Sequence, residues 1–129
     1  MAKILVVDDD PDYLMQVSVR LKADGFAVTT AEGLAEAETA LQTALPDVAV
    51  IDISMPEVGG LEVIHRLRPE FPDLPILVLT MHEEQQYAIR VIEAGAMGYI
   101  TKKSAPEQLV QAIRKVHEGS RFLTEEAAE

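Results

Sequence analysis

The stretch ILVVDDDP at residues 4–11 decides the fold expected for this chain. Four consecutive apolar residues, mostly β-branched, are typical of a strand that is buried on both faces of a parallel sheet. The acidic residues come directly after it, and Asp10 followed by Pro11 is the pattern of a helix N-cap with proline at the first helical position. The stretch therefore predicts a strand that passes directly into a helix, which is the repeating unit of an α/β sheet.

The same alternation recurs along the rest of the chain. Further apolar runs predict two more central strands, at residues 48–51 and 76–79. A more polar run at residues 26–30 predicts an edge strand, and residues 98–101 predict a short fifth strand. Apolar residues at helical spacing lie between these runs. They predict five helices, which end at Gly25, before Pro46, at Pro69, at Gly95 and at Gly119.

This order predicts one α/β domain over residues 1–120, and 129 residues are too few for two ordinary domains. Parallel strands with right-handed crossover helices form a three-layer α/β/α sandwich. Five strands fit the flavodoxin-like (βα)5 arrangement with strand order 2-1-3-4-5, which places the polar run at an edge.

Composition excludes several classes of function. Asp and Glu number 22 against 11 Lys and Arg, so the formal net charge is −11. A chain this acidic repels nucleic-acid phosphates and anionic lipid, so we expect neither direct nucleic-acid contact nor membrane binding. The absence of Cys excludes disulfides and thiolate metal sites. The apolar run at residues 4–7 is too short for a signal peptide or a membrane span, so we expect a cytoplasmic protein.

Polar residues follow four of the predicted strands. In the 2-1-3-4-5 order, strands 1 and 3 are neighbours, so Asp8 and Asp9 should lie beside Asp52 at the carboxyl end of the sheet. Three carboxylates so close together need a cation to offset their repulsion, and Mg²⁺ is a hard ion that prefers oxygen ligands. Thr80 and Lys102 follow strands 4 and 5 and suit the oxygens of a phosphoryl group.

This set predicts phosphoryl transfer to a carboxylate nucleophile. Taken alone, Lys102 fits a solvated lysine and Thr80 an ordinary strand residue, so the prediction rests on their joint placement. A phosphatase with its nucleophile after the first strand is an alternative, from the D-x-D spacing of Asp8 and Asp10. That class usually needs a longer chain, and it leaves the run DISMP at residues 52–56 unexplained.

In this order, the motifs resemble the receiver domain of a two-component response regulator, over the chain from Ala2 to about Gly119. They are the Asp8-Asp9 pair, the 52–56 run, Gly60, Thr80 and Lys102. The resemblance implies a phosphoacceptor domain that assists its own phosphotransfer and dephosphorylation, rather than a free-standing enzyme.

The resemblance also implies the role of each residue. Asp52 takes the phosphoryl group from a phosphohistidine on a sensor histidine kinase, and Lys102 pairs with that group. Asp9, Asp52 and the backbone carbonyl of Ser54 bind Mg²⁺ directly, while Asp8 acts mainly through a bound water.

Two further pairs of residues match positions with known roles in receivers. Thr80 and Tyr99 resemble the switch pair, in which the hydroxyl moves towards the phosphate and the aromatic ring turns inward. Ser54 and His82 resemble the variable pair that tunes the lifetime of the phosphorylated state.

The segments 79–84 and 93–102 are similar to the NarL/FixJ subfamily, whose members carry a C-terminal LuxR-type helix-turn-helix. Residues 121–129 resemble the start of the linker to such a domain. The resemblance therefore implies transcriptional output, with DNA contact through a C-terminal domain. Because that domain would bind DNA, we expect phosphorylation to favour a homodimer of receivers, with release of the C-terminal domain as the alternative switch. The alternative is a single-domain receiver that serves in a phosphorelay or binds a target protein.

Overall fold

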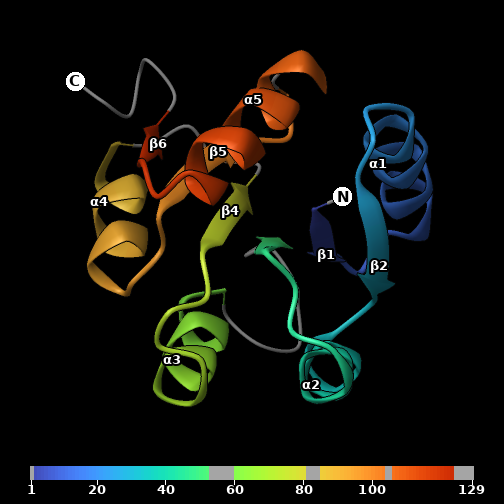
Figure 1. Cartoon of the computed structure of the whole chain (residues 1–129). Helices are drawn as coiled ribbons and strands as arrows, with labels where there is room; N and C mark the ends of the chain where they lie inside the picture. The colour runs from blue at the N-terminus through green and yellow to red at the C-terminus, as the bar shows by residue number, and fades with distance from the viewer. Residues whose placement is uncertain (1, 53–59, 81–84, 104–105, 124–129) are drawn as a thin grey trace.

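The computed structural model describes residues 2–52, 60–80, 85–103 and 106–123. Strands and helices alternate along these residues (Figure 1). The elements are β1 (Lys3–Val7), α1 (Pro11–Ala23), β2 (Ala27–Ala31), α2 (Leu34–Thr43), β3 (Val48–Asp52), α3 (Gly60–Glu70), β4 (Ile76–Thr80), α4 (Gln85–Glu93), β5 (Gly98–Thr101), α5 (Pro106–His117) and β6 (Phe122–Leu123).

The strands form one parallel sheet in the order β2-β1-β3-β4-β5-β6. The predicted order of the first five strands is therefore confirmed. The sixth strand is an addition, because Phe122–Leu123 pairs with Gly98 and Tyr99 of β5. The sequence pattern did not reveal it, since two residues are too few for a periodic signal and the stretch reads as the start of a linker.

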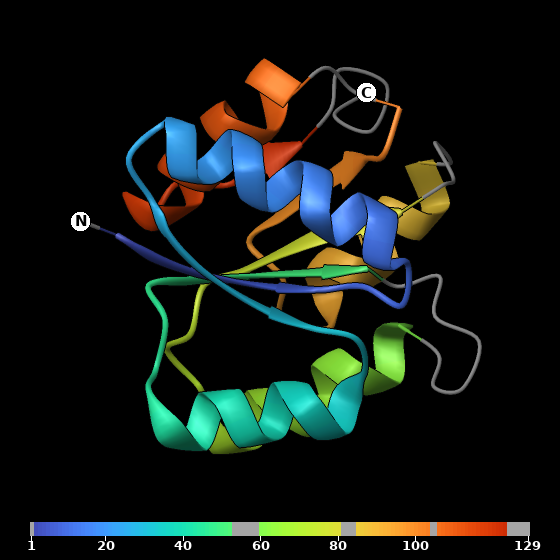
Figure 2. The ribbon, with the colours of Figure 1, turned by 90° about the vertical axis from the view of Figure 1, so that its right-hand side faces the viewer.

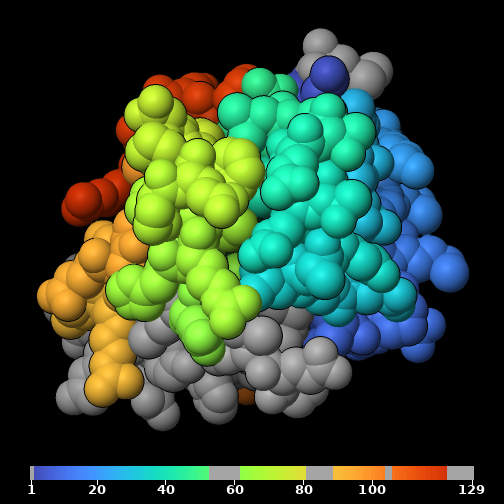
Figure 3. Space-filling model, turned by 90° about the horizontal axis from the view of Figure 1, so that it is seen from below, coloured from blue at the N-terminus to red at the C-terminus, as the bar shows by residue number. Residues whose placement is uncertain are grey.

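Helices cover both faces of the sheet and make three layers (Figure 2). Helices α1 and α5 pack on one face, while α2 and α3 lie side by side over the other, as Figure 3 shows from below. Alternate strand residues point to opposite faces, so Leu5 and Val7 pack towards α2 and α3 and Ile4 and Val6 towards α1 and α5. Burying each such side chain stabilises the fold by roughly 1.5–3 kcal/mol.

The helices end near the residues that the sequence predicts, with one exception. Asp10 caps α1 by accepting hydrogen bonds from the backbone N–H groups of Asp12 and Tyr13, at 3.0 and 3.4 Å. Gly25 lies beyond the end of α1 with φ +93°, a left-handed conformation that favours glycine. The expectation that Pro69 ends α3 is wrong, because the helix continues to Glu70. A proline so close to a helix end removes only one late hydrogen bond, so the last turn tolerates it.

Arg68 ties the end of α3 to the end of α4. Its guanidinium donates hydrogen bonds to the carbonyls of Phe71, Pro72 and Leu74 at 2.9–3.0 Å and also to that of Gly95. Burial lowers the pKa of this group, against the opposing effect of the Asp73 charge. The guanidinium thereby fixes the connection that leads into β4.

All the strands run in one direction, so their carboxyl ends meet at one edge of the sheet (Figure 2). Ligand sites of open parallel sheets lie at this edge, where the strand order reverses between β1 and β3. None of the helices in the described part of the chain has the length and apolar character that a membrane span requires.

Candidate functional site

Three carboxylates converge where β1 and β3 end. These strands are hydrogen-bonded neighbours with Val7 opposite Ile51, so Asp8 and Asp52 emerge side by side. One oxygen from each of Asp8, Asp9 and Asp52 lies within 4.8 Å of the others. Asp8 and Asp52 are buried, at 0% and 1% exposed, whereas Asp9 is exposed. The cluster is thus a buried pair with a third carboxylate that faces water.

The local backbone fixes this arrangement. The Asp8 amide donates a hydrogen bond to the carbonyl of Ala31 at 3.0 Å, which ties the end of β1 to the end of β2. The Asp10 amide donates to Oδ1 of Asp8, also at 3.0 Å, and so orients the Asp8 carboxylate. Asp10 itself serves as the helix cap, which explains why only the two acidic residues before it join the cluster.

Lys102 reaches the cluster from the end of β5, which lies two strands away from β3 in the sheet. Its backbone N–H donates to the carbonyl of Thr80 at 2.8 Å, which sets the point where the chain leaves β5. Its ammonium lies 2.6 Å from Oδ2 of Asp8 and donates a hydrogen bond to Oδ2 of Asp52 at 3.1 Å. The side chain is only 13% exposed. One cation therefore bridges the two buried carboxylates.

Burial and like charge oppose the ionisation of Asp8. The pKa of Asp8 is raised to about 6, mainly by burial and also by the Asp52 carboxylate, although Lys102 and the Asp10 amide act in the opposite direction. Burial alone would lower the pKa of Lys102, but its ion pairs with Asp8 and Asp52 outweigh burial and raise that pKa. The protein compensates the negative charge of the cluster only in part.

The donor set fits a hard divalent cation. All the donors are carboxylate oxygens, and the exposed Asp9 leaves a side open for the waters that Mg²⁺ retains. Within the described part of the chain, the buried Oδ2 of Asp8 accepts no hydrogen bond, although the Lys102 ammonium approaches it. A cation bound here would favour the ionised form of Asp8, which burial disfavours.

Thr80 and Tyr99 lie on adjacent strands next to the cluster. Thr80 ends β4 opposite Thr101, and it is fully buried. Tyr99 is also fully buried, and it packs in the core on the side of α2 and α3, together with Val91 of α4. The inward position that the resemblance associates with the switched state is thus the position of the ring in this structure.

Two of the predicted site residues, Ser54 and His82, lie outside the described residues. Their predicted roles in metal binding and in tuning the phosphorylated state therefore stay predictions.

Tyr13 is a site residue that the sequence reasoning missed. Its ring lies beside the Lys102 ammonium, with 4.6 Å between Nζ and the ring centroid. Burial raises the pKa of Tyr13 to about 12, so its phenol stays neutral at physiological pH. The available signal was helical spacing, because Tyr13 shares the face of α1 that carries the buried Val17 and Leu21.

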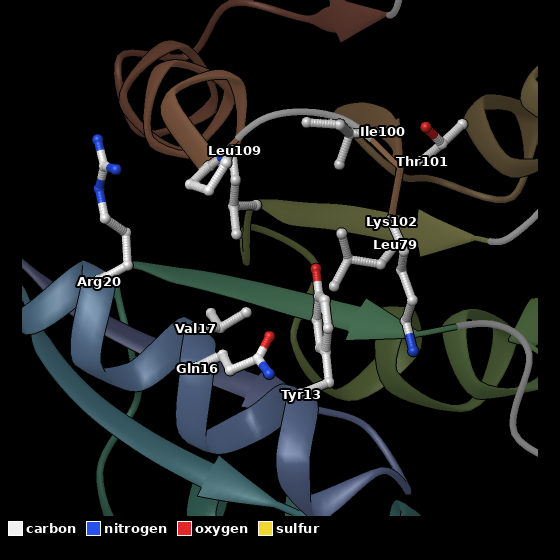
Figure 4. A pocket seen from close by; sticks show the side chains of 10 residues that line it. Tyr13, Gln16, Val17, Arg20, Leu79, Ile100, Thr101, Lys102 and Leu109 are labelled. Carbon is white, nitrogen blue, oxygen red and sulfur yellow. The ribbon is translucent and has the colours of Figure 1, made fainter.

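A cavity of about 250 Å³ adjoins this side of the site, between α1 and α5. Figure 4 shows Tyr13 reaching across from α1 towards the ends of β4 and β5, where Lys102 descends beside it. Its apolar lining includes Val17, Leu79 and Leu109.

Residues 4–114 match the family model described as the response regulator receiver domain. The whole chain aligns with the response regulator GacA of Pseudomonas aeruginosa at 39% identity, and it spans 61% of that protein's length.

Two solved structures extend the comparison. A LuxR-family two-component response regulator from Aurantimonas sp. SI85-9A1 superposes with a TM-score of 0.87 at 35% identity, over 99% of this chain and 93% of that chain. The chemotaxis protein CheY4 of Vibrio cholerae, crystallised at low pH, superposes with a TM-score of 0.85 at 33% identity, over 90% of this chain and 98% of that chain. The family model covers most of the chain, the relatives exceed 30% identity, and the fold agrees, so this chain belongs to the response regulator receiver domain family.

Proposed function

We propose that Asp52 is the phosphoacceptor of this domain, with a phosphohistidine of a sensor histidine kinase as the donor. Receiver domains are phosphoacceptor signalling domains of response regulators, which interact with histidine kinases. The observation that carries the assignment to Asp52 is its position at the end of β3, 3.1 Å from the Lys102 ammonium and within the cluster of three carboxylates. Asp8 has both contacts too, at the end of β1, so the choice of Asp52 rests on its place at the end of β3, the position of the phosphoacceptor in the receiver domains that this chain resembles.

The proposed step is an in-line transfer. A carboxylate oxygen of Asp52 attacks phosphorus and forms the O–P bond while the N–P bond of the phosphohistidine breaks. The imidazole nitrogen keeps the electron pair of the broken bond, and a proton from water can neutralise it. The Lys102 ammonium, already beside Asp52, pairs with the negative charge of the transferred group.

Receiver domains bind Mg²⁺ at an acidic pocket, and here Asp8, Asp9 and Asp52 form that kind of cluster. We propose that Asp9 and Asp52 hold the ion directly, with the Ser54 carbonyl, and that Asp8 acts through a water. When bound, Mg²⁺ supplies charge neutralisation at the phosphoryl oxygens. Asp8 and Asp9 fix the position of the bound ion beside Asp52. Asp52 is buried, which limits the access of bulk water to its carboxylate.

For output, we propose that Thr80 reports the phosphoryl group to the region of Tyr99. The Thr80 hydroxyl belongs to a buried residue at the end of β4, the strand next to Asp52, and Tyr99 lies on the following strand. Phosphorylation would bias one of two arrangements of this region, and we expect it to favour a homodimer.

The whole protein is proposed to control transcription from the cytoplasm. This chain spans about three fifths of the length of GacA, and one structural match is titled a LuxR-family response regulator. In that protein, residues 1–120 would be the receiver domain, and residues 121–129 would lead to a helix-turn-helix that contacts DNA. A single-domain receiver is the second candidate, because the chain matches CheY4 over 98% of the CheY4 chain.

Acetyl phosphate tests the proposed phosphoacceptor function without the kinase. We expect the protein to gain the mass of one phosphoryl group when both acetyl phosphate and Mg²⁺ are present, and none when a chelator is added. Lys102→Ala should lower the yield of this product more than it lowers Mg²⁺ affinity, because the ammonium pairs with the phosphoryl group. A phosphoryl gain of equal size in chelator would contradict the proposed metal-assisted chemistry.

A further inference from the structure

We infer that Tyr13 is a positioning residue, whose aromatic face holds the Lys102 ammonium where the phosphoryl group must arrive. This inference rests on the phosphoacceptor function proposed above. The ammonium has three described neighbours at the site, namely Asp8 at 2.6 Å, Asp52 at 3.1 Å and the Tyr13 ring centroid at 4.6 Å. The ring distance lies within the range of about 6 Å over which a cation is attracted to an aromatic face.

The ring is held firmly by its own surroundings. Tyr13 lies in the first turn of α1, where its N–H donates to the capping carboxylate of Asp10. Its side chain is half-buried against the core shared by α1 and α5. Helix α1 thus presents the ring to Lys102 (Figure 4), while the end of β1 presents Asp8 and the end of β3 presents Asp52.

The ring matters most once a cation occupies the carboxylates. Without metal, Lys102 has two anionic partners, and these suffice to hold it. A divalent ion held directly by Asp9 and Asp52, and through a water by Asp8, offsets the charge of Asp8 and Asp52 and repels the ammonium. The Tyr13 face carries no net charge that the ion could neutralise, so it continues to hold Lys102 beside Asp52. The ammonium is then in place before the phosphoryl group enters, and binding that group requires less reordering.

Tyr13→Leu and Tyr13→Phe make a matched pair. Phenylalanine keeps the aromatic face and loses only the hydroxyl, whereas leucine keeps an apolar side chain with good helix propensity and loses the face. The contact between an ammonium and an aromatic face corresponds to roughly three- to ten-fold in an equilibrium constant. Both variants should fold, because the position is only half-buried.

The first measurement is made with Mg²⁺ and without phosphate, because the ring matters most when a cation offsets the charge of the two carboxylates. Reductive methylation of the lysines, followed by peptide mass spectrometry, reports how well each ammonium is held, and the exposed Lys103 serves as the internal reference. Relative to Lys103, we expect Lys102 to react roughly three- to ten-fold faster in Tyr13→Leu than in the parent, and within about two-fold of the parent in Tyr13→Phe. Equal Lys102 rates in the two variants would overturn the inference.

The second measurement uses beryllofluoride with Mg²⁺ as the probe for the phosphoryl group. We expect Tyr13→Leu to bind beryllofluoride roughly three- to ten-fold more weakly, with Mg²⁺ affinity within about two-fold of the parent and Tyr13→Phe like the parent in both. A role in packing alone would weaken both affinities together, and that result would refute the positioning role. A parent protein that binds no beryllofluoride would overturn the phosphoacceptor function itself. The methylation rates of Lys102 would still show whether the ring holds its ammonium.

Discussion

The buried carboxylate of Asp8 should make the stability of the metal-free protein depend on pH in an unusual direction. Its pKa is raised from 3.8 to about 6, chiefly by burial. Below about pH 4 the group is protonated in both the folded and the unfolded chain, and it contributes no pH dependence. Between pH 4 and 6 the unfolded chain loses this proton first, so the free energy of unfolding falls as the pH rises. Above about pH 6 the carboxyl is ionised in both states, so the loss of stability is complete and no longer changes with pH.

The size of this effect follows from the shift. About two pKa units at about 1.4 kcal/mol each give an upper value of about 3 kcal/mol for the loss of stability at neutral pH. Since Asp8 is 0% exposed, solvent screening reduces this value little. Mg²⁺ should reverse much of the loss, because a bound cation favours the ionised carboxylate.

Urea denaturation between pH 4 and 7.5, in chelator, measures this directly. Asp8→Asn removes the titrating group. Between about pH 4 and 7.5 the free energy of unfolding should therefore fall less in this variant than in the parent, and the two falls should differ by up to about 3 kcal/mol. Glu118→Gln is the matched control, because it removes one negative charge at an exposed position and should keep the pH profile of the parent. Parallel profiles for the parent and Asp8→Asn in chelator would show that the Asp8 carboxyl does not cause the pH dependence.

Three further substitutions test the proposed switch residue, the turn between α4 and β5, and the cap of α1. Thr80→Ala should still gain a phosphoryl group from acetyl phosphate but lose the shift towards dimer in light scattering, since the hydroxyl is proposed to report the phosphate; a variant that binds Mg²⁺ and takes up no phosphate would contradict this division of roles. Gly95→Ala should lower the melting temperature by several degrees, because Gly95 has φ +117° and a Cβ would lie 2.8 Å from Nε of Arg68; an unchanged melting temperature would argue against the strain. Asp10→Ala should cost about 1 kcal/mol in urea denaturation through loss of the α1 cap, and a cost near zero would show that the cap contributes nothing.

The sequence predicted the parts of the fold that depend on local pattern. Continuous apolar runs such as Ile4–Val7 identified the central strands, because residues buried on both faces leave no polar alternation. Glycines after the helices, such as Gly25, marked helix ends because their φ values are positive. The β6 strand was missed because its two residues pair only with the edge that β5 leaves available.

The convergence of Asp8, Asp9 and Asp52 could also be foreseen, since it follows from strand order alone. The contact between Lys102 and Tyr13 could not, because it depends on how α1 packs against the sheet and on the path of a long side chain. The same holds for the hydrogen bond from Arg68 to the carbonyl of Gly95, which joins the ends of α3 and α4. Contacts between residues distant in sequence leave no periodic signal for one chain to reveal.

Intact mass measurement with site mapping shows whether Asp52 carries the phosphoryl group. The parent, Asp52→Asn and the control Asp73→Asn, an exposed carboxylate in the connection before β4, are each treated with acetyl phosphate and Mg²⁺. Asn is nearly isosteric with Asp but is not a nucleophile, so Asp52→Asn should fold and gain no phosphoryl group. The parent and Asp73→Asn should each gain one, which borohydride trapping places on Asp52. A phosphoryl gain in Asp52→Asn equal to that of the parent, or trapping at another residue, would contradict the claim.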